Sequence, residues 1–187
     1  GEGHGILPER HPLAGYLQPF QPAGLPATAN VVGLLPGADP RTPRALVLGA
    51  HLDHLGRDGS LSGDQIFNGA DDNASGVAAL IEIARLLAAQ PQETRDRTVV
   101  CVAFSAEESG LLGSRYYCDH PVVPHEDVIA MINLDGVGNM ENRRLLVCGT
   151  GSAREFDAIL PGLNTAFGLD LVTRPDPVGG SDHMSFL

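Results

Sequence analysis

The sequence contains only three cysteines, Cys101, Cys118 and Cys148, and no two of them are spaced as Cys-x-x-Cys. This odd and sparse set excludes a scaffold held together by many disulfides. Cys101 and Cys148 lie inside apolar runs, which favours a role as small core residues.

Basic residues are also scarce, and long apolar runs are missing. The sequence has 12 Lys and Arg and 23 Asp and Glu, and the resulting formal charge of −11 repels nucleic acid and anionic lipid. Nucleic acid is therefore not an expected partner. No apolar stretch approaches the roughly 18 residues that read as a membrane span. The 187 residues are enough for one domain with a substantial core.

The order of polar and apolar segments predicts an α/β fold. Residues 1–29 contain five prolines and predict an extended, proline-rich segment that leads into a domain over residues 30–187. Short apolar runs predict buried strands, and longer periodic runs predict helices, of which the last is expected to be broken or kinked at Pro161. The predicted strands cover 30–37, 44–51, 98–104, 128–135 and 144–150, and the predicted helices cover 71–91, 108–117 and 152–168. This alternation is typical of a three-layer αβα domain around a mostly parallel or mixed sheet.

Histidine and carboxylates follow the ends of three predicted strands. His51 and Asp53 end one strand, Glu107 and Glu108 follow another, and Asp135 ends a third. Ligands of such sheets bind outside the carboxyl ends of the strands, so these side chains are expected at one edge. The long helix, which Asp72 or Asn73 would cap, begins at the same edge, next to Asp71.

The pair His51 and Asp53 has two interpretations. Two residues apart on extended backbone, both side chains point to the same side. A histidine can then bind a metal while the carboxylate holds its other nitrogen, or the pair can be a structural hydrogen bond. His54 is the weaker candidate, because alternation would turn it to the opposite face.

The adjacent acids also have more than one interpretation. Glu107 and Glu108 could be the acidic first turn of a helix, or one could bind a metal while the other handles protons. One Asp is enough to cap the long helix, so Asp71 is available to bridge two ions. Asp135 is a further ligand or an ordinary strand-to-turn residue. Nitrogen and oxygen ligands without thiolate suit zinc, with manganese or cobalt as alternatives.

Six stretches occur in order along the chain: "NVVGLLPG", "GAHLDHLG", "NGADDNASGVAALIEIARLL", "VAFSAEESGLLGS", "INLDGVG" and "GGSDHMSF". Together they resemble the zinc aminopeptidases of the M28 type. The resemblance implies two zinc ions and a peptide substrate with a free N-terminus. It implies His51 and Asp135 on one zinc, Glu108 on the other and Asp71 between them. Glu107 would be the general base, and Asp53 would orient His51.

The sequence departs from the family pattern after "GGSDHMSF". Family members carry a last zinc-binding histidine in a later Tyr-His stretch, which this sequence lacks together with the closing strand and helix. Asp182 and His183 are therefore expected beside the metals, with His183 as the alternative last ligand. The second zinc, the activity of the chain, the side-chain preference and the oligomeric state stay open. The alternatives are a single-zinc transferase resembling glutaminyl cyclase and a truncated binding module. Only the resemblance favours an extracellular or periplasmic location.

Overall fold

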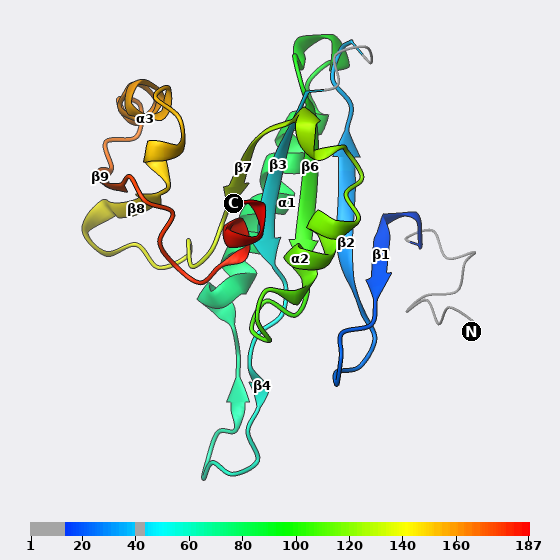
Figure 1. Cartoon of the computed structure of the whole chain (residues 1–187). Helices are drawn as coiled ribbons and strands as arrows, with labels where there is room; N and C mark the ends of the chain where they lie inside the picture. Colours follow the sequence, from blue (N-terminus) through cyan, green and yellow to red (C-terminus); the bar gives the residue numbers. More distant parts are fainter. Residues whose placement is uncertain (1–13, 40–43) are drawn as a thin grey trace.

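The computed structural model describes residues 14–39 and 44–187. Its centre is a five-stranded sheet with the order β1-β2-β6-β3-β7 (Figure 1). β3 runs parallel to β6 and β7, whereas β2 runs antiparallel to β1 and β6. The bounds are β1 Leu17–Phe20, β2 Thr28–Leu35, β3 Ala45–His51, β6 Thr98–Phe104 and β7 Val128–Asn133.

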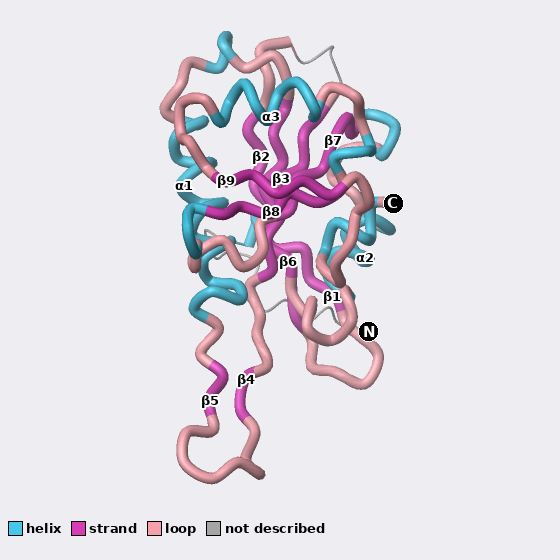
Figure 2. The backbone as a smooth tube through the Cα atoms, turned by 90° about the vertical axis from the view of Figure 1, so that its left-hand side faces the viewer, coloured by secondary structure: helices cyan, strands magenta, loops and turns pink. Residues whose placement is uncertain are grey.

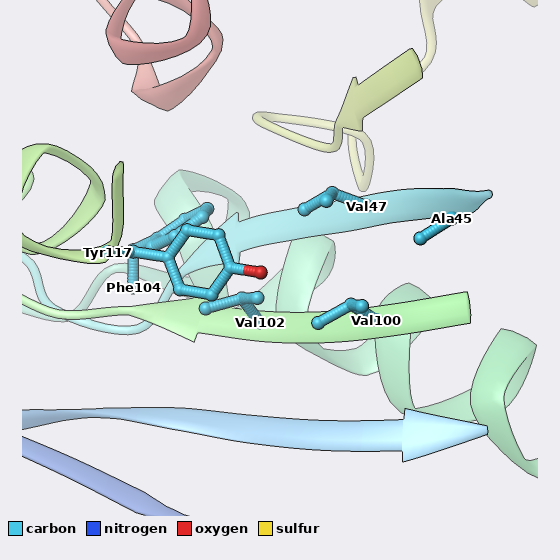
Figure 3. Packing of buried hydrophobic residues seen from close by; sticks show 6 residues of the cluster. All are labelled: Ala45, Val47, Val100, Val102, Phe104 and Tyr117. Carbon is cyan, nitrogen blue, oxygen red and sulfur yellow. The ribbon is translucent and has the colours of Figure 1, made fainter. Parts of the chain in front are cut away.

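Helices cover both faces of this sheet because successive residues of its central strands point to opposite sides. Val47 packs in a cluster with Tyr117 of α2 (Leu112–Asp119), and the next residue, Leu48, packs in a cluster with Leu80 of α1 (Gly76–Ala88). Figure 3 shows the first cluster, in which Tyr117 lies beside the sheet. Its members are Ala45, Val47, Val100, Val102, Phe104 and Tyr117. The predicted mixed sheet with flanking helices is confirmed.

The beginning of the described chain is more ordered than the sequence predicts. The prediction of an extended segment over residues 1–29 falls partly on residues 1–13, which lie outside the described residues. Within the rest of that segment, residues Leu17–Phe20 form the extended strand β1, which pairs with β2 and is part of the main sheet. Pro19 is tolerated in β1 because this strand is at the edge of the sheet.

A second, two-stranded parallel sheet follows β7. It consists of β8 (Arg144–Cys148) and β9 (Asp170–Arg174), connected through α3 (Phe156–Asn164). The strand β9 is not predicted from the sequence. The sequence predicts a break or a kink at Pro161, and the break is wrong, because α3 continues through this residue. The carbonyl that Pro161 leaves without a donor belongs to Asp157, which is exposed and can bond to water.

An arm extends away from the body of the molecule between β3 and α1. It is a hairpin of two very short antiparallel strands, β4 (Gly56–Arg57) and β5 (Ile66–Phe67). Figures 1 and 2 show it projecting beyond the end of the main sheet. None of the helices formed by the described residues is long and apolar enough to cross a membrane.

Candidate metal centre

The carboxyl ends of β3, β6 and β7 lie at one edge of the main sheet, because these strands are parallel. His51 is the last residue of β3, the two glutamates follow β6, and Asp135 follows β7. The turn Ala70–Ser75, which leads into α1, brings further acids to the same edge. The sheet topology therefore gathers the residues that the strand-end argument predicts.

Asn73 fixes this turn against the end of β7. Its Oδ1 accepts a hydrogen bond from the N–H of Gly76 at 2.9 Å, and its Nδ2 donates to the carbonyl of Leu134 at 2.9 Å. A Cβ on Gly76 would lie 2.3 Å from the Leu134 carbonyl oxygen, so the helix start can approach β7 this closely only with glycine. The cap that the sequence assigns to Asp72 or Asn73 is provided by Asn73. The Asp72 carboxylate is left free for the site.

His51 is buried and oriented by the backbone. Its Nδ1 donates to the carbonyl of Asp53 at 3.0 Å. Its Nε2 then faces Oδ1 of Asp72 at 3.0 Å and Oδ1 of Asp135 at 3.4 Å. A metal-binding histidine is typically held through one nitrogen while the other faces the ion.

The charges around His51 favour a cation at this position. Burial alone would lower the pKa of His51, but the hydrogen bond to Asp135 and the charge of Glu107 raise this pKa to about 9. The hydrogen bond with His51 in turn holds the pKa of Asp135 below its usual range, although burial opposes this. In the metal-free protein the proton on His51 compensates carboxylate charge that a metal ion would otherwise neutralise.

Asp53 contacts His51 through its backbone carbonyl and not through its carboxylate. Its carboxylate lies 3.9 Å from Nδ1 of His51, too far for a hydrogen bond, and the backbone carbonyl orients the ring instead. The two carboxylate oxygens accept the backbone N–H groups of Glu107 at 3.0 Å and Glu108 at 3.2 Å. Asp53 thus positions the adjacent glutamates directly, and His51 through its backbone.

Glu107 is in an environment that suits proton transfer. Burial raises its pKa to about 7, and the carboxylates of Asp182, Asp135 and Glu108 add to this, while the charge of His51 opposes it. A general base works best when its pKa is near the working pH. Ligand atoms of His51, Glu107 and Asp135 lie within 4.8 Å of one another.

The prediction that Asp71 reaches the metals is not supported by its contacts. Its Oδ1 accepts the backbone N–H groups of Gly138 at 2.6 Å and Asn139 at 3.1 Å, so it stabilises the loop after β7. The next residue, Asp72, faces the site instead. Its Oδ1 lies 3.0 Å from Nε2 of His51, and its Oδ2 lies 3.8 Å from Nδ1 of His54. Asp72 is the carboxylate that reaches two histidines at once.

His54 lies in the site, contrary to the argument from strand alternation. That argument fails because β3 ends at His51 and the following residues are not extended strand. Nδ1 of His54 lies 2.8 Å from Oε1 of Glu108, yet the two atoms are not aligned as a hydrogen bond. Both atoms are buried and lack any hydrogen-bond partner. Buried polar atoms normally have a partner, so the close approach of this nitrogen and this oxygen without a hydrogen bond suits two ligands of one cation.

Asp182 and His183 lie beside the site. Neither oxygen of the fully buried Asp182 has a hydrogen-bond partner. Burial raises the pKa of Asp182 to about 6, the Ser114 hydroxyl and the charge of His51 oppose this, and the charges of Asp53 and Asp135 add to it. Burial lowers the pKa of His183, with the charge of Asp135 opposing. Among the described residues, two groups of side chains could hold a metal ion, and neither group includes Asp182 or His183.

The donor atoms fit a hard or borderline divalent cation. One group is His51, Glu107 and Asp135, and the other is His54, Asp72 and Glu108. Imidazole and carboxylate are the ligands of catalytic zinc sites, with manganese and cobalt as the next choices. Asp72 reaches from the second group into the first, which suits a pair of ions.

Comparison with known proteins gives a consistent result. The model of "Peptidase family M28" matches residues 30–187. Aminopeptidase YwaD of Bacillus subtilis is 34% identical over 91 residues, which are 49% of this chain and 17% of that protein. A solved structure of a zinc aminopeptidase from Bacillus subtilis matches with a TM-score of 0.68 and 27% identity, over 86% of this chain and 37% of that one.

A glutaminyl cyclase is also similar. The structure of this enzyme from Bacteroides thetaiotaomicron, bound to N-acetylhistamine, matches with a TM-score of 0.59 and 25% identity, over 84% of this chain and 59% of that one. This chain therefore spans less than two thirds of each of these three proteins. The match to the family model covers both candidate metal-binding groups and the main sheet apart from β1 and the first two residues of β2. The chain belongs to peptidase family M28.

Proposed function

We propose that this chain carries the metal-binding part of a zinc aminopeptidase that hydrolyses N-terminal peptide bonds. The observation that carries the proposal is the position of Asp72, whose two oxygens face His51 and His54. Family membership supports the peptidase chemistry, and the names of the similar proteins support zinc. The proposal also includes the number of zinc ions, the roles of the individual residues and the class of substrate.

The residues that would hold the ions form two sets that share Asp72. His51, Asp135 and Asp72 would hold one zinc, and Asp72, Glu108 and His54 would hold the second. Zinc supplies Lewis acidity, which makes water more acidic and polarises a carbonyl group. His183 is not needed for this arrangement, because the nitrogen within reach of Glu108 belongs to His54.

Glu107 would be the general base. It accepts a proton from the attacking water through its carboxylate and returns the proton to the departing amine. Asp53 holds the backbone of this residue by the hydrogen bond to its N–H.

The substrate would be a peptide with a free N-terminus. Two zinc ions would neutralise the carboxylates that bind them. The carboxylates of Glu107 and Asp53, which are not proposed ligands, lie at the same edge and would favour an ammonium group there over an internal peptide segment. The net charge of −11 acts in the same direction at longer range.

Glu107→Gln tests the proposal. We expect turnover of leucine p-nitroanilide by the zinc-loaded chain to fall by about 100-fold or more, since loss of a general base typically costs this much. Zinc content, measured by atomic absorption, should stay the same. The matched control is Glu126→Gln, which removes an exposed carboxylate away from the edge of the sheet. Undiminished turnover in the Glu107 variant would contradict the assignment.

A glutaminyl cyclase is the second candidate, because a solved enzyme of that kind has a similar structure. The two functions differ in the expected number of ions, because we expect one zinc in the cyclase. Two zinc ions per chain at saturation favour the peptidase, whereas one zinc together with cyclisation of an N-terminal glutamine favours the cyclase. Bound zinc without either reaction would indicate a binding module.

A further inference from the structure

The arm formed by β4 and β5 begins and ends at the metal centre. It starts directly after His54 and Leu55, and it returns at Gly69, three residues before Asp72. Figures 1 and 2 show that it projects from the body on the side where the turn before α1 lies. The side chains at the base of the arm therefore lie next to any ligand bound at the site.

Phe67 is the aromatic residue at this base. Its ring meets the ring of His54 edge-on, with 6.4 Å between the centroids and an interplanar angle of 68°. In the strand register it lies opposite Gly56, which has no side chain to cover the ring. A Cβ built at Gly56 would have no atom within 4 Å, so the space over this position is open. Phe67 is accordingly 38% exposed although it contacts a residue of the metal centre.

The surroundings of Phe67 combine charge with apolar surface. His54 contacts the Phe67 ring and also faces two carboxylates. Its Nδ1 lies 2.8 Å from Oε1 of Glu108 and 3.8 Å from Oδ2 of Asp72. The Asp72 side chain is 54% exposed, so a ligand can reach this part of the metal centre from solvent. The ammonium group and the side chain of an amino acid leave the same carbon atom. A first residue whose amino group is held at the metal centre beside His54 therefore has its side chain next to the base of the arm, where Phe67 lies.

We propose that Phe67 is a specificity-determining residue that contacts the side chain of the first residue of the bound peptide and favours large apolar side chains there. The inference rests on the proposed function, because it assumes an N-terminal residue at the metal centre. An exposed aromatic ring gains from covering by apolar surface, whereas a glycine at the first position leaves it in water. A single apolar contact of this kind typically changes selectivity by about 10-fold or more.

The experiment measures binding, so it needs no turnover. The zinc-loaded full chain is titrated by calorimetry with leucine hydroxamate and with glycine hydroxamate, and the ratio of the two dissociation constants is the readout. We expect the wild type to prefer the leucine compound and Phe67→Ala to lose about 10-fold of that preference. Phe67→Leu, which retains apolar volume, should keep most of it.

Ile66→Ala is the matched control. Ile66 is the neighbouring residue of the same two-residue strand, it is 60% exposed, and alternation turns it to the other face of the arm. An unchanged preference in Phe67→Ala, with normal zinc content and circular dichroism, overturns the inference. An equal loss in Ile66→Ala also overturns it, because the arm as a whole would then be responsible. A wild type that binds hydroxamates without preferring leucine contradicts this inference alone. A wild type that binds neither zinc nor hydroxamate contradicts the proposed function as well.

Discussion

Replacing Asp182 with asparagine should stabilise the metal-free protein, and this stabilisation should be larger at neutral pH than at acidic pH. Asp182 is fully buried, and its two oxygens have no hydrogen-bond partners. A negative charge in this position is costly because burial removes its hydration. Asparagine has nearly the same shape and no charge, so the variant removes this cost.

The size of the effect follows from the shift in the pKa of Asp182 from 3.8 to about 6. A carboxyl group whose pKa is raised in the folded state favours folding below pH 3.8, and this contribution is lost as the pH rises to 6 and above. The complete loss corresponds to about 3 kcal/mol of unfolding free energy. Between pH 4 and pH 8 we expect about 2 kcal/mol of it, because the unfolded chain is already partly ionised at pH 4.

The assay is urea unfolding of wild type and Asp182→Asn in the presence of a chelator, at several values between pH 4 and pH 8. The free energy of unfolding of the variant minus that of the wild type should increase across this interval by about 2 kcal/mol. Asp176→Asn, which changes an exposed carboxylate in the preceding segment, should show no such trend. A difference between Asp182→Asn and wild type that does not change with pH would refute the reasoning.

Two further predictions concern the metal ligands. Asp72→Asn should lower zinc affinity by about 10-fold or more, because a charged ligand is lost, whereas Asp71→Asn should leave zinc affinity nearly unchanged. Competition with a chromophoric chelator measures both affinities. A larger loss in Asp71→Asn than in Asp72→Asn would show that Asp71 is the bridging ligand. His54→Ala should lower the affinity for the second zinc ion by a similar factor, whereas His183→Ala should still bind both ions, as measured by zinc stoichiometry. Loss of the second ion in the His183 variant alone would show that His54 is not a ligand of that ion.

The strands and their shared edge could be predicted from the sequence. The buried runs that end in His51 and before Glu107 have an apolar pattern that only a central strand satisfies. Parallel strands place their carboxyl ends at one edge regardless of the details of packing. The gathering of His51, Glu107, Glu108 and Asp135 follows from these local patterns, and the structure agrees with it.

The sequence could not decide which of two neighbouring acids faces the site. Asp71 and Asp72 have the same chemistry, and the path of the turn between Gly69 and Gly76 orients one toward the loop after β7 and the other toward His51. His54 was placed wrongly for a related reason, because strand alternation stops where β3 ends. The oxygens of Asp53 likewise found partners in a segment more than fifty residues away.

Local patterns of apolar and polar residues thus predicted the central strands β2, β3, β6 and β7, the helices on both faces of the sheet and the edge at which the polar groups meet. Only the tertiary structure decided which oxygen and nitrogen atoms face one another, and that Phe67 of the arm lies beside them. The physical reason is range: burial periodicity is set by neighbours in sequence, whereas distances of about 3 Å between side chains depend on how separate segments pack.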